Sequence, residues 1–170
     1  FKKINYYEIR KKIILILIAL IPLTYGNELL GFNPNYSYIL LKINTTGNIN
    51  IFYNGFYLYP NEIYINNINQ SIISNKYDLN TTNNSIKLIW KEELVKTDYL
   101  FYRCNKIDEI DFSYFKSSKV TNTEGMFSEC SSLKSLDLFY FNTSLVENMY
   151  EMFHSCCVVI GVTCRRSGYR

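Results

Sequence analysis

The carboxyl-terminal part of the chain repeats itself with a period of 26 residues. Residues 101–126 and 127–152 are identical at nine of 26 positions, and Phe153 and Cys156 continue the series. A fixed period of this length is typical of proteins that stack one structural unit, because a single unit cannot bury its apolar face alone. The repeat therefore predicts a stacked architecture for this part of the chain. The identical pairs are Phe101/Phe127, Cys104/Cys130, Asp111/Asp137, Tyr114/Tyr140, Phe115/Phe141, Ser118/Ser144, Val120/Val146, Asn122/Asn148 and Met126/Met152.

Two apolar patterns recur within each repeat. Leu133, Leu136 and Leu138 have the spacing of a leucine-rich repeat strand. Residues 146–156 then carry apolar side chains every three or four positions, which is the spacing of one face of a helix. We therefore predict an α/β solenoid of leucine-rich-repeat type, and we expect so short a solenoid to be marginally stable on its own. Its two to three coils are residues 101–126, 127–152 and, in part, 153–170.

The repeat also resembles a known family. Residues 126–156 are similar to the repeat of the BspA-like leucine-rich repeat surface proteins of bacteria and protists, although Phe139 and Asn142 depart from it. The resemblance covers about residues 101–157. It implies extracellular display and adhesive or ligand-binding roles, and it does not imply catalysis. The residues that carry it are Met126, Phe127, Cys130, Ser132, Leu133, Leu136, Asp137, Leu138, Phe141, Thr143, Ser144, Val146, Met149, Met152 and Phe153.

The first 26 residues have the order of a secretory signal peptide. Basic residues at 2–12 precede an apolar run at 13–23, and small residues occupy positions −3 and −1 of a potential cleavage site after Gly26. A retained membrane anchor is an alternative, although roughly 20 apolar residues are needed to cross a bilayer. A buried segment of the domain is another. In a secreted glycoprotein six Asn-x-Ser/Thr sequons would be glycosylation candidates: Asn35, Asn44, Asn69, Asn80, Asn83 and Asn142.

Residues 27–100 form a second, strand-rich β region in this prediction. Short runs rich in Ile, Tyr and Phe alternate with turn residues, as expected for a small antiparallel domain. Asn54-Gly55 predicts a tight hairpin turn, because both positions tolerate a positive φ. Trp90 and the other aromatic residues are interpreted as core rather than as a sugar-stacking platform. The strands are expected at residues 36–43, 49–53, 62–65 and 86–91.

The cysteines and the single histidine offer little chemistry. Cys104, Cys130 and Cys156 are in register, so they form either neighbouring disulfides or a ladder of buried thiols; we favour the thiols. The chain has no Cys-x-x-Cys pair, which argues against a zinc site. His154 and Cys156 are two residues apart, so a helix would point them to different faces. We predict no enzyme activity, no cofactor and no metal.

The charge distribution argues against nucleic acid as a partner. The net charge of +3 comes from +4 in residues 1–26 and +3 in residues 165–170, which leaves −4 between them. A phosphate backbone would need a basic face there. The chain would contact a membrane only through an uncleaved amino-terminal segment.

The sequence as a whole predicts a secreted or cell-surface protein that binds a protein or surface glycan ligand. Loops of the β region are an equal candidate for the binding surface. The alternatives are a membrane-anchored structural scaffold and an intracellular protein-binding module. Asp111 and Asp137 would lie side by side, and we expect them to bond neighbouring Ser or Thr rather than act as acid and base. On the exposed strand face of the repeats the predicted binding residues are Glu109, Asp111, Ser113, Ser135, Asp137 and Phe139.

Overall fold

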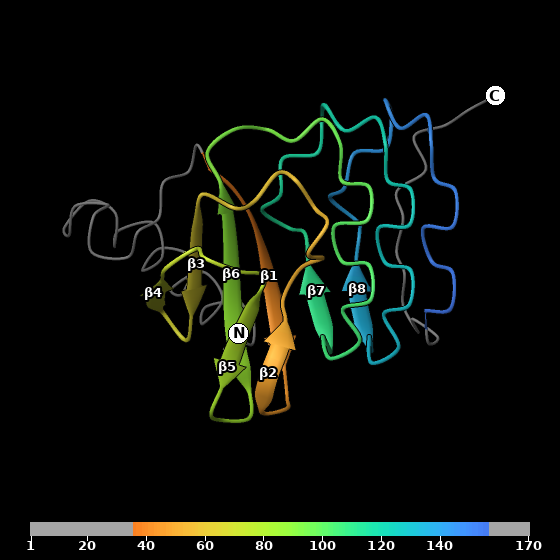
Figure 1. The fold of residues 1–170 in the computed structure, drawn as a ribbon. Helices are drawn as coiled ribbons and strands as arrows, with labels where there is room; N and C mark the ends of the chain where they lie inside the picture. The colour runs from red at the N-terminus through yellow and green to blue at the C-terminus, as the bar shows by residue number, and fades with distance from the viewer. Residues whose placement is uncertain (1–35, 157–170) are drawn as a thin grey trace, which may run out of the picture. The chain divides into compact units, whose positions relative to one another are not determined.

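The computed structural model describes residues 36–156, which form an all-β structure with eight strands and no helix (Figure 1). We call residues 36–90 the antiparallel region and residues 91–156 the repeat region. The predicted signal peptide, Asn35, Cys157 and Cys164 lie outside the described residues. The strands are β1 (Ser37–Ile43), β2 (Gly47–Asn50), β3 (Glu62–Ile65), β4 (Ile68–Gln70), β5 (Lys76–Leu79), β6 (Asn84–Trp90), β7 (Glu109–Asp111) and β8 (Ser135–Asp137).

Six strands make one sheet that runs through both regions. Its order is β4-β3-β6-β1-β7-β8, and β2 and β5 form a separate antiparallel pair. β1 pairs antiparallel with β6 on one side and with β7 on the other, whereas β7 and β8 pair in parallel. The repeat region therefore begins as an extension of the antiparallel region.

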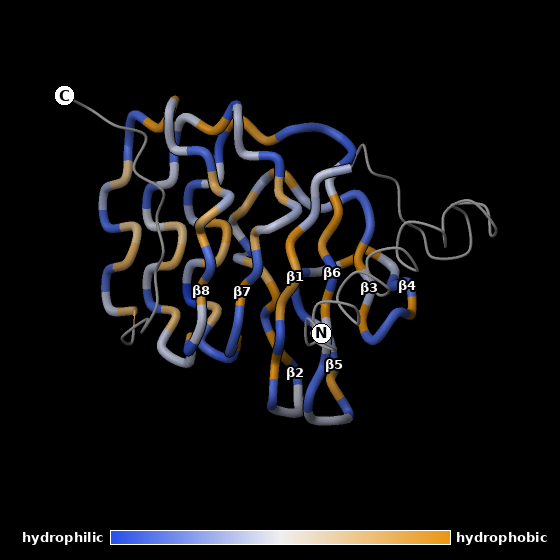
Figure 2. The backbone as a smooth tube through the Cα atoms, turned by 180° about the vertical axis from the view of Figure 1, so that it is seen from behind, coloured by the Kyte–Doolittle hydropathy of each residue, from blue (hydrophilic) through white to orange (hydrophobic). Residues whose placement is uncertain are grey.

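The strands of the antiparallel region follow from alternating burial. Ile39, Leu41 and Ile43 of β1 are fully buried, and the residues between them face outward. β6 places Ile86 and Leu88 beside them in the core. Such alternation is what a strand with one buried face requires, and Figure 2 shows the apolar residues along β1 and β6. The strands expected at 36–43, 62–65 and 86–91 are confirmed.

The predicted hairpin at Asn54-Gly55 is wrong. β2 ends at Asn50 and pairs with β5, so no strand pairing encloses this turn. The tight hairpin lies instead at Asn66 and Asn67, which have φ values of 51° and 67° and join β3 to β4. Two consecutive positive φ angles match the twist of paired strands, and Asn adopts them more readily than most residues.

The α/β solenoid of leucine-rich-repeat type is also wrong, because the segment expected to be helical consists of tight turns. Leu100 donates its N–H to the carbonyl of Thr97, at 3.2 Å, three residues earlier. The next N–H, that of Phe101, donates instead to the carbonyl of Met126, at 3.0 Å, in the corresponding segment one period later. An α-helix would bond every N–H within its own segment. Apolar spacing of three or four residues fits successive tight turns as well as a helix, which is why the sequence pattern misleads.

These alternating bonds join the three repeats into a hydrogen-bonded stack. In eight of these bonds the acceptor lies 25 residues after the donor, and Asn122 forms parallel bridges with Lys96 and with Asn148. Figure 1 shows the three turn segments lying side by side with the same path. The donor residues are Thr97, Tyr99, Phe101 and Arg103 in the first segment and Thr123, Gly125, Phe127 and Glu129 in the second.

Each turn segment has two positions with positive φ, four residues apart. Tyr99, Gly125 and Glu151 occupy the first, with φ between 52° and 57°. Each is the third residue of a tight turn, where a type II turn requires this conformation. The equivalent second position is filled by Arg103, Glu129 and Ser155.

Aromatic stacks fill the core of the repeat region. Phe127 stacks on Phe101 and Phe153, with ring centroids 6.0 and 5.6 Å apart. Phe112 meets Phe101 and Phe127 edge-on at 6.3 and 5.8 Å. Hydrophobic residues recur at corresponding levels of neighbouring repeats (Figure 2). The 26-residue register therefore brings identical side chains into contact, as the repeat predicts.

Candidate functional site

The strand face predicted to bind ligand is present, with its carboxylates held locally. Parallel pairing sets Glu109 beside Ser135 and Asp111 beside Asp137. Glu109 forms an ion pair with Lys42 of β1. This side of the sheet is therefore occupied by bonds that shape the strand ends.

Asp111 and Asp137 each accept a bond from the backbone two residues on. Asp111 Oδ1 lies 2.7 Å from the N–H of Ser113, and Asp137 Oδ1 lies 2.8 Å from the N–H of Phe139. These are Asx turns, in which the carboxylate replaces a backbone acceptor. Asp111 therefore bonds a neighbouring serine, as predicted, through the backbone N–H of that serine, whereas Asp137 bonds the backbone of Phe139. Ser113, Ser135 and Phe139 are exposed.

The three cysteines in register form a ladder of thiols. Cys104 and Cys130 are buried free thiols, and Cys130 Sγ donates to the carbonyl of Phe101 at 3.0 Å. Cys156 is half-buried and its Sγ donates to the carbonyl of Cys130. Burial raises the pKa of Cys104 well above its usual value and that of Cys130 to about 12. Since thiolates are the reactive form, these positions favour packing over chemistry.

Five of the predicted glycosylation sequons lie within the described residues. Their asparagines, Asn44, Asn69, Asn80, Asn83 and Asn142, are all exposed. None of the elements between residues 36 and 156 is a helix that could span a bilayer.

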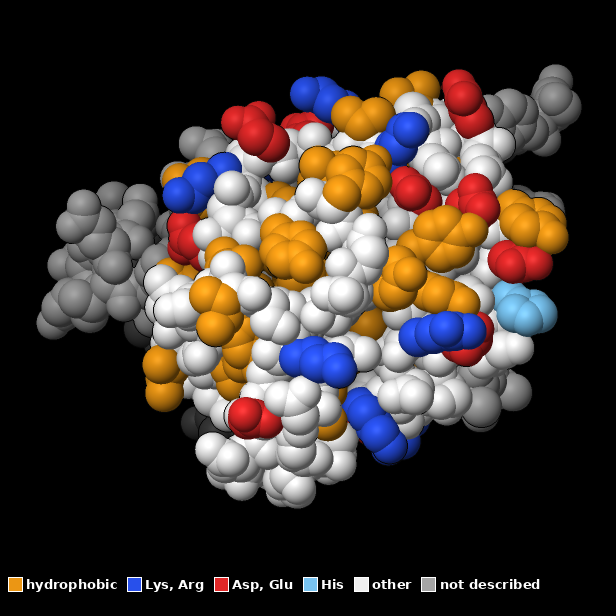
Figure 3. Space-filling model, in the orientation of Figure 1, with side chains coloured by type: hydrophobic (Ala, Val, Ile, Leu, Met, Phe, Trp, Pro, Cys, Tyr) orange, Lys and Arg blue, Asp and Glu red, His pale blue; other side chains and the backbone are white. Residues whose placement is uncertain are grey.

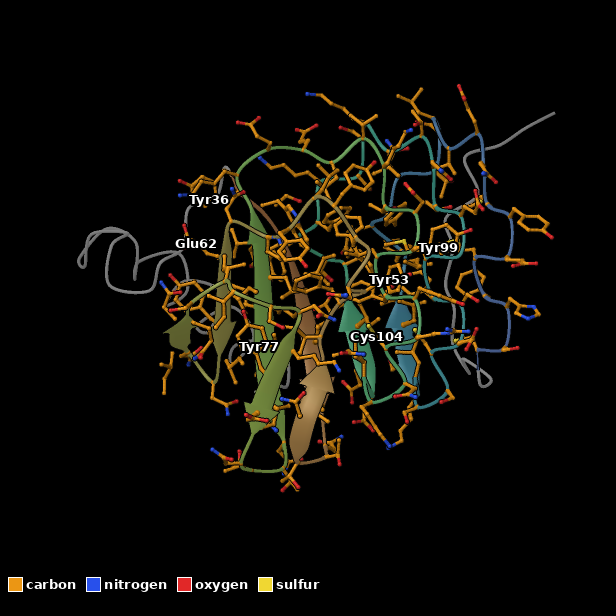
Figure 4. All side chains as sticks on the ribbon, viewed as in Figure 1. Tyr36, Tyr53, Glu62, Tyr77, Tyr99 and Cys104 are labelled. Carbon is orange, nitrogen blue, oxygen red and sulfur yellow. The ribbon has the colours of Figure 1, made fainter. Side chains whose placement is uncertain are left out.

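A cavity of about 350 Å³ lies where the stacked turns meet the segment after β2. Tyr99 and Tyr102 come from the first turn segment, and Tyr53 comes from the antiparallel region; all three rings are half-buried. Figure 4 labels Tyr53 and Tyr99 at neighbouring positions there. We call the whole lining the tyrosine–glutamate site: Tyr53, Tyr99, Tyr102, Ser128, Glu129, Glu151 and His154.

Carboxylates of the second turn segment fix two of the tyrosines. Tyr99 Oη donates to Glu124, and Asn148 Nδ2 donates to the other oxygen of Glu124 at 2.9 Å. Tyr102 Oη donates to Glu129 at 3.1 Å. Each ring is therefore held by a residue about 26 positions further along the chain, so the stack of repeats determines the geometry of the site.

The ring of Tyr99 packs against the backbone of Gly125, which has no side chain to block it. A Cβ atom at Gly125 would come within 2.4 Å of Tyr99 Cε1. The equivalent position of the next repeat is Glu151, which is exposed and reaches the cavity. Tyr99, Gly125 and Glu151 therefore form one column, in which a ring covers a glycine and a carboxylate follows.

Negative charge dominates the electrostatics of the site. The hydrogen bond to Glu124, then burial and nearby carboxylates, raise the pKa of Tyr99 to about 12. Burial and the bond to Glu129 raise the pKa of Tyr102. The Arg103 guanidinium lowers the pKa of Glu129, to which it donates at 3.0 Å. At neutral pH Tyr99 and Tyr102 are therefore neutral, and Glu129 is ionised.

Figure 3 shows the same face as a space-filling surface. Hydrophobic side chains gather on the right of the view, bordered by acidic groups, by Arg or Lys and by the single histidine, His154. The residues with this chemistry come from three successive repeats and from Tyr53.

The sequence did not predict this site, because the repeat pattern draws attention to positions with the same residue in both repeats. The identical Asn122 and Asn148 accept bonds from the backbone N–H groups of Glu124 and Tyr150, so they shape the turns. The side chains of the site lie at positions where the residues differ from one repeat to the next. The columns that would have revealed it are Tyr99/Gly125/Glu151, Tyr102/Ser128/His154 and Arg103/Glu129/Ser155.

Comparison with known proteins gives one match. Residues 67–159 match a family described as "Mycoplasma protein of unknown function, DUF285". No curated protein matches, and no solved structure matches. The match does not support the BspA-like leucine-rich repeat family, so the assignment suggested by the resemblance is wrong, as is the leucine-rich repeat solenoid that it implied.

Proposed function

We propose a function from the surface of the chain itself. The chain belongs to the DUF285 family, and the description of that family, Mycoplasma protein of unknown function, assigns none. In this proposal the chain is a recognition module that binds a partner protein through the tyrosine–glutamate site. Adhesion would follow where the partner lies on another surface.

The observation that carries the proposal is the group of half-buried tyrosines around an open cavity. Tyr53, Tyr99 and Tyr102 line this cavity, and hydrogen bonds to Glu124 and Glu129 fix the last two. Tyrosine is enriched in protein interfaces because a rigid ring supplies contact area and its hydroxyl supplies a hydrogen bond. Rings that are already held in place lose little conformational freedom on binding.

The stack of repeats supports binding in a second way. Backbone bonds between repeats hold positions 99, 125 and 151 side by side. Their side chains are not needed for those bonds, so they can differ from repeat to repeat without loss of the fold. A regular backbone with varied exposed side chains is how stacked repeats form extended binding surfaces.

We further propose that the chain acts at the cell surface or outside the cell. The support is the basic and apolar order of residues 1–26, together with the exposure of the five described sequon asparagines. The mass of the product secreted from a eukaryotic host, before and after removal of N-linked glycans, tests this. Uncleaved, soluble and unglycosylated product would contradict it.

The recognition proposal is tested by selecting a displayed library of random 12-residue peptides on the full chain. We expect enriched peptides that are lost on the variant Tyr99→Leu/Tyr102→Leu. The matched control is Tyr57→Leu/Tyr140→Leu, which removes two tyrosines that are each 62% exposed and lie outside the cavity. Retention by the control with loss on the site variant supports the proposal.

Two results would contradict it. A library with no enriched peptides would favour a scaffold whose repeats bind nothing. Peptides that survive Tyr99→Leu/Tyr102→Leu but are lost on Ser135→Lys/Asp137→Lys would move recognition to the strand face of β8. Circular dichroism of each variant establishes that it is folded before selection.

A further inference from the structure

The three tyrosines form walls rather than a flat platform. The ring of Tyr53 stands at 79° to that of Tyr102, with centroids 5.1 Å apart. The ring of Tyr99 stands at 76° to the same ring, at 5.6 Å. Rings that meet nearly at right angles around a hollow present π-faces from more than one side. This geometry suits a compact cationic group, because the face of an aromatic ring attracts positive charge.

The site already holds one cation in this manner. The guanidinium carbon of Arg103 lies 4.8 Å from the centre of the Tyr102 ring, while Arg103 Nε bonds Glu129 at 3.0 Å. One tyrosine and one carboxylate thus bind a positive side chain at one edge of the cavity. This contact within the chain shows that a tyrosine ring and a carboxylate at this surface can together bind a positively charged side chain.

The other edge has the same groups without a cation. Glu124 and Glu151 belong to no ion pair among residues 36–156. Both lie close enough to Tyr99 to raise its pKa. Asp98, beside Tyr99 in the chain, has a buried carboxylate oxygen with no hydrogen-bond partner among the described residues. Negative charge around Tyr99 therefore exceeds the positive charge available within the described structure.

We infer that the cavity receives a lysine or arginine side chain of the partner, placed against Tyr99 and beside Glu151. This inference rests on the proposed recognition function and names its chemistry. The volume of about 350 Å³ is at the lower end of ligand cavities, which suits one long side chain with some water. The partner would present a basic residue on an exposed segment.

A sugar fits this arrangement less well. Stacking of a sugar needs a flat, exposed ring face, and Tyr102 has Arg103 over its face and two rings meeting it edge-on. The uncompensated carboxylates also favour a cation over a neutral ligand. Binding of an uncharged saccharide would be a different result, and the experiment below distinguishes it.

The test uses the ¹⁵N-labelled full chain and three probes followed by NMR. The probes are acetyl-Gly-Lys-Gly-amide, the same peptide with an acetylated lysine side chain, and maltose. We expect saturable shifts of the backbone signals of Tyr99, Gly125 and Glu151 with the lysine peptide, weaker binding of its acetylated form, and no shifts with maltose. Acetylation removes the charge and keeps the length of the side chain. Equal shifts with the acetylated peptide, shifts with maltose instead, or no shifts at these residues would overturn the inference.

Variants separate a specific site from general attraction of charge. Glu151→Gln should weaken binding of the lysine peptide about two- to fivefold, the effect expected for one exposed ion pair. Glu92→Gln is the matched control, since Glu92 is exposed and lies outside the cavity, and it should leave binding unchanged. Tyr99→Phe should retain binding, whereas Tyr99→Leu should weaken it by a similar factor. Equal loss with Glu92→Gln would overturn the inference.

The peptide selection distinguishes failure of this inference from failure of the proposed function. Enriched peptides that depend on Tyr99 but lack lysine and arginine would overturn the cationic ligand and leave recognition standing. A selection without any peptide that depends on Tyr99 would overturn both.

Discussion

The antiparallel region and the repeat region share one sheet but reach stability by different means. In the antiparallel region, long strands bury alternate aliphatic side chains such as Ile39, Leu41 and Leu88. In the repeat region the strands are three residues long, and aromatic stacks and bonds between turns take over. A fold maintained by bonds between repeats leaves its exposed positions available for binding. This difference explains why the tyrosine–glutamate site is mostly built from repeats.

The largest expected effect follows from separating the two regions. Residues 101–170 alone should not fold, because β7 loses its pairing with β1 and the N–H of Asp108 loses the carbonyl of Lys42. Stacks of fewer than about three repeats also lack enough neighbours to bury their cores. Thermal unfolding followed by circular dichroism checks this against the full chain. A cooperative, high-temperature transition of the fragment would contradict it.

A core substitution in each region sharpens the comparison. Phe127→Ala should cost about 3–5 kcal/mol of unfolding free energy, since Phe127 is fully buried and stacked on both sides. Leu88→Ala, also fully buried, should cost about 2–5 kcal/mol. Urea denaturation measures both. A cost below about 1 kcal/mol for Phe127→Ala would show that the aromatic stack does not stabilise the repeats.

The junction between the regions should be sensitive to acid. The Asp108 side chain is 8% exposed; it pairs with Lys134 and accepts the N–H of Asn44 at 2.7 Å. Burial raises the pKa of Asp108, but the bonds from Lys134 and Asn44 outweigh it and leave the pKa below its usual value.

This carboxylate therefore contributes stability above about pH 4, near the unfolded pKa of Asp. The contribution is lost as the pH falls through the lower folded pKa. Asp108→Asn should cost about 1–3 kcal/mol at pH 7 and flatten the acid limb of stability against pH. Denaturation at several pH values checks this. If Asp108→Asn lost stability with acid as steeply as the native chain, Asp108 would not be the acid-sensitive group of the junction.

The smallest expected effect concerns the support of Tyr99. Gly125 and Gly47 both have positive φ, but only Gly125 would bring a Cβ against another residue, the Tyr99 ring. Gly125→Ala should therefore lower the unfolding free energy by about 1–2 kcal/mol and move the Tyr99 ring. Gly47→Ala should lower it only by the cost of placing alanine at a positive φ. Denaturation and the NMR signals of Tyr99 measure this. An unmoved ring in Gly125→Ala would contradict the assigned contact.

Much of the antiparallel region could be predicted from sequence, because apolar and polar residues that alternate along a short run indicate a strand with one buried face. Three of the expected strands are present. The strand expected at 49–53 is wrong, because β2 spans Gly47–Asn50 and ends before Ile51. The sequence did not predict β4 and β5, because both strands are short and partly polar. The repeat period likewise predicted which residues meet, such as Phe101 and Phe127. It did not predict how the chain turns between them. Spacing of three or four residues describes inward-facing positions and leaves the backbone path undetermined.

The candidate site could not be predicted for a related reason. Asp111 and Asp137 attracted notice as identical polar residues, yet they bond the backbone of their own turns. Tyr53 joins the site from a segment 46 residues before Tyr99, and no pattern in the sequence links the two. The folded chain joins the two segments directly, because the N–H of Tyr53 donates to the carbonyl of Leu100 at 2.9 Å.

The central claim is that Glu151 and a basic residue of the partner meet at the tyrosine–glutamate site. A double-mutant cycle tests it most directly, using the full chain and Glu151→Gln against the lysine peptide and its acetylated form, with affinities from NMR titration. Acetylation should weaken binding to the native chain about two- to fivefold more than binding to Glu151→Gln. Equal weakening for both chains would show that the two groups do not interact and would contradict the claim.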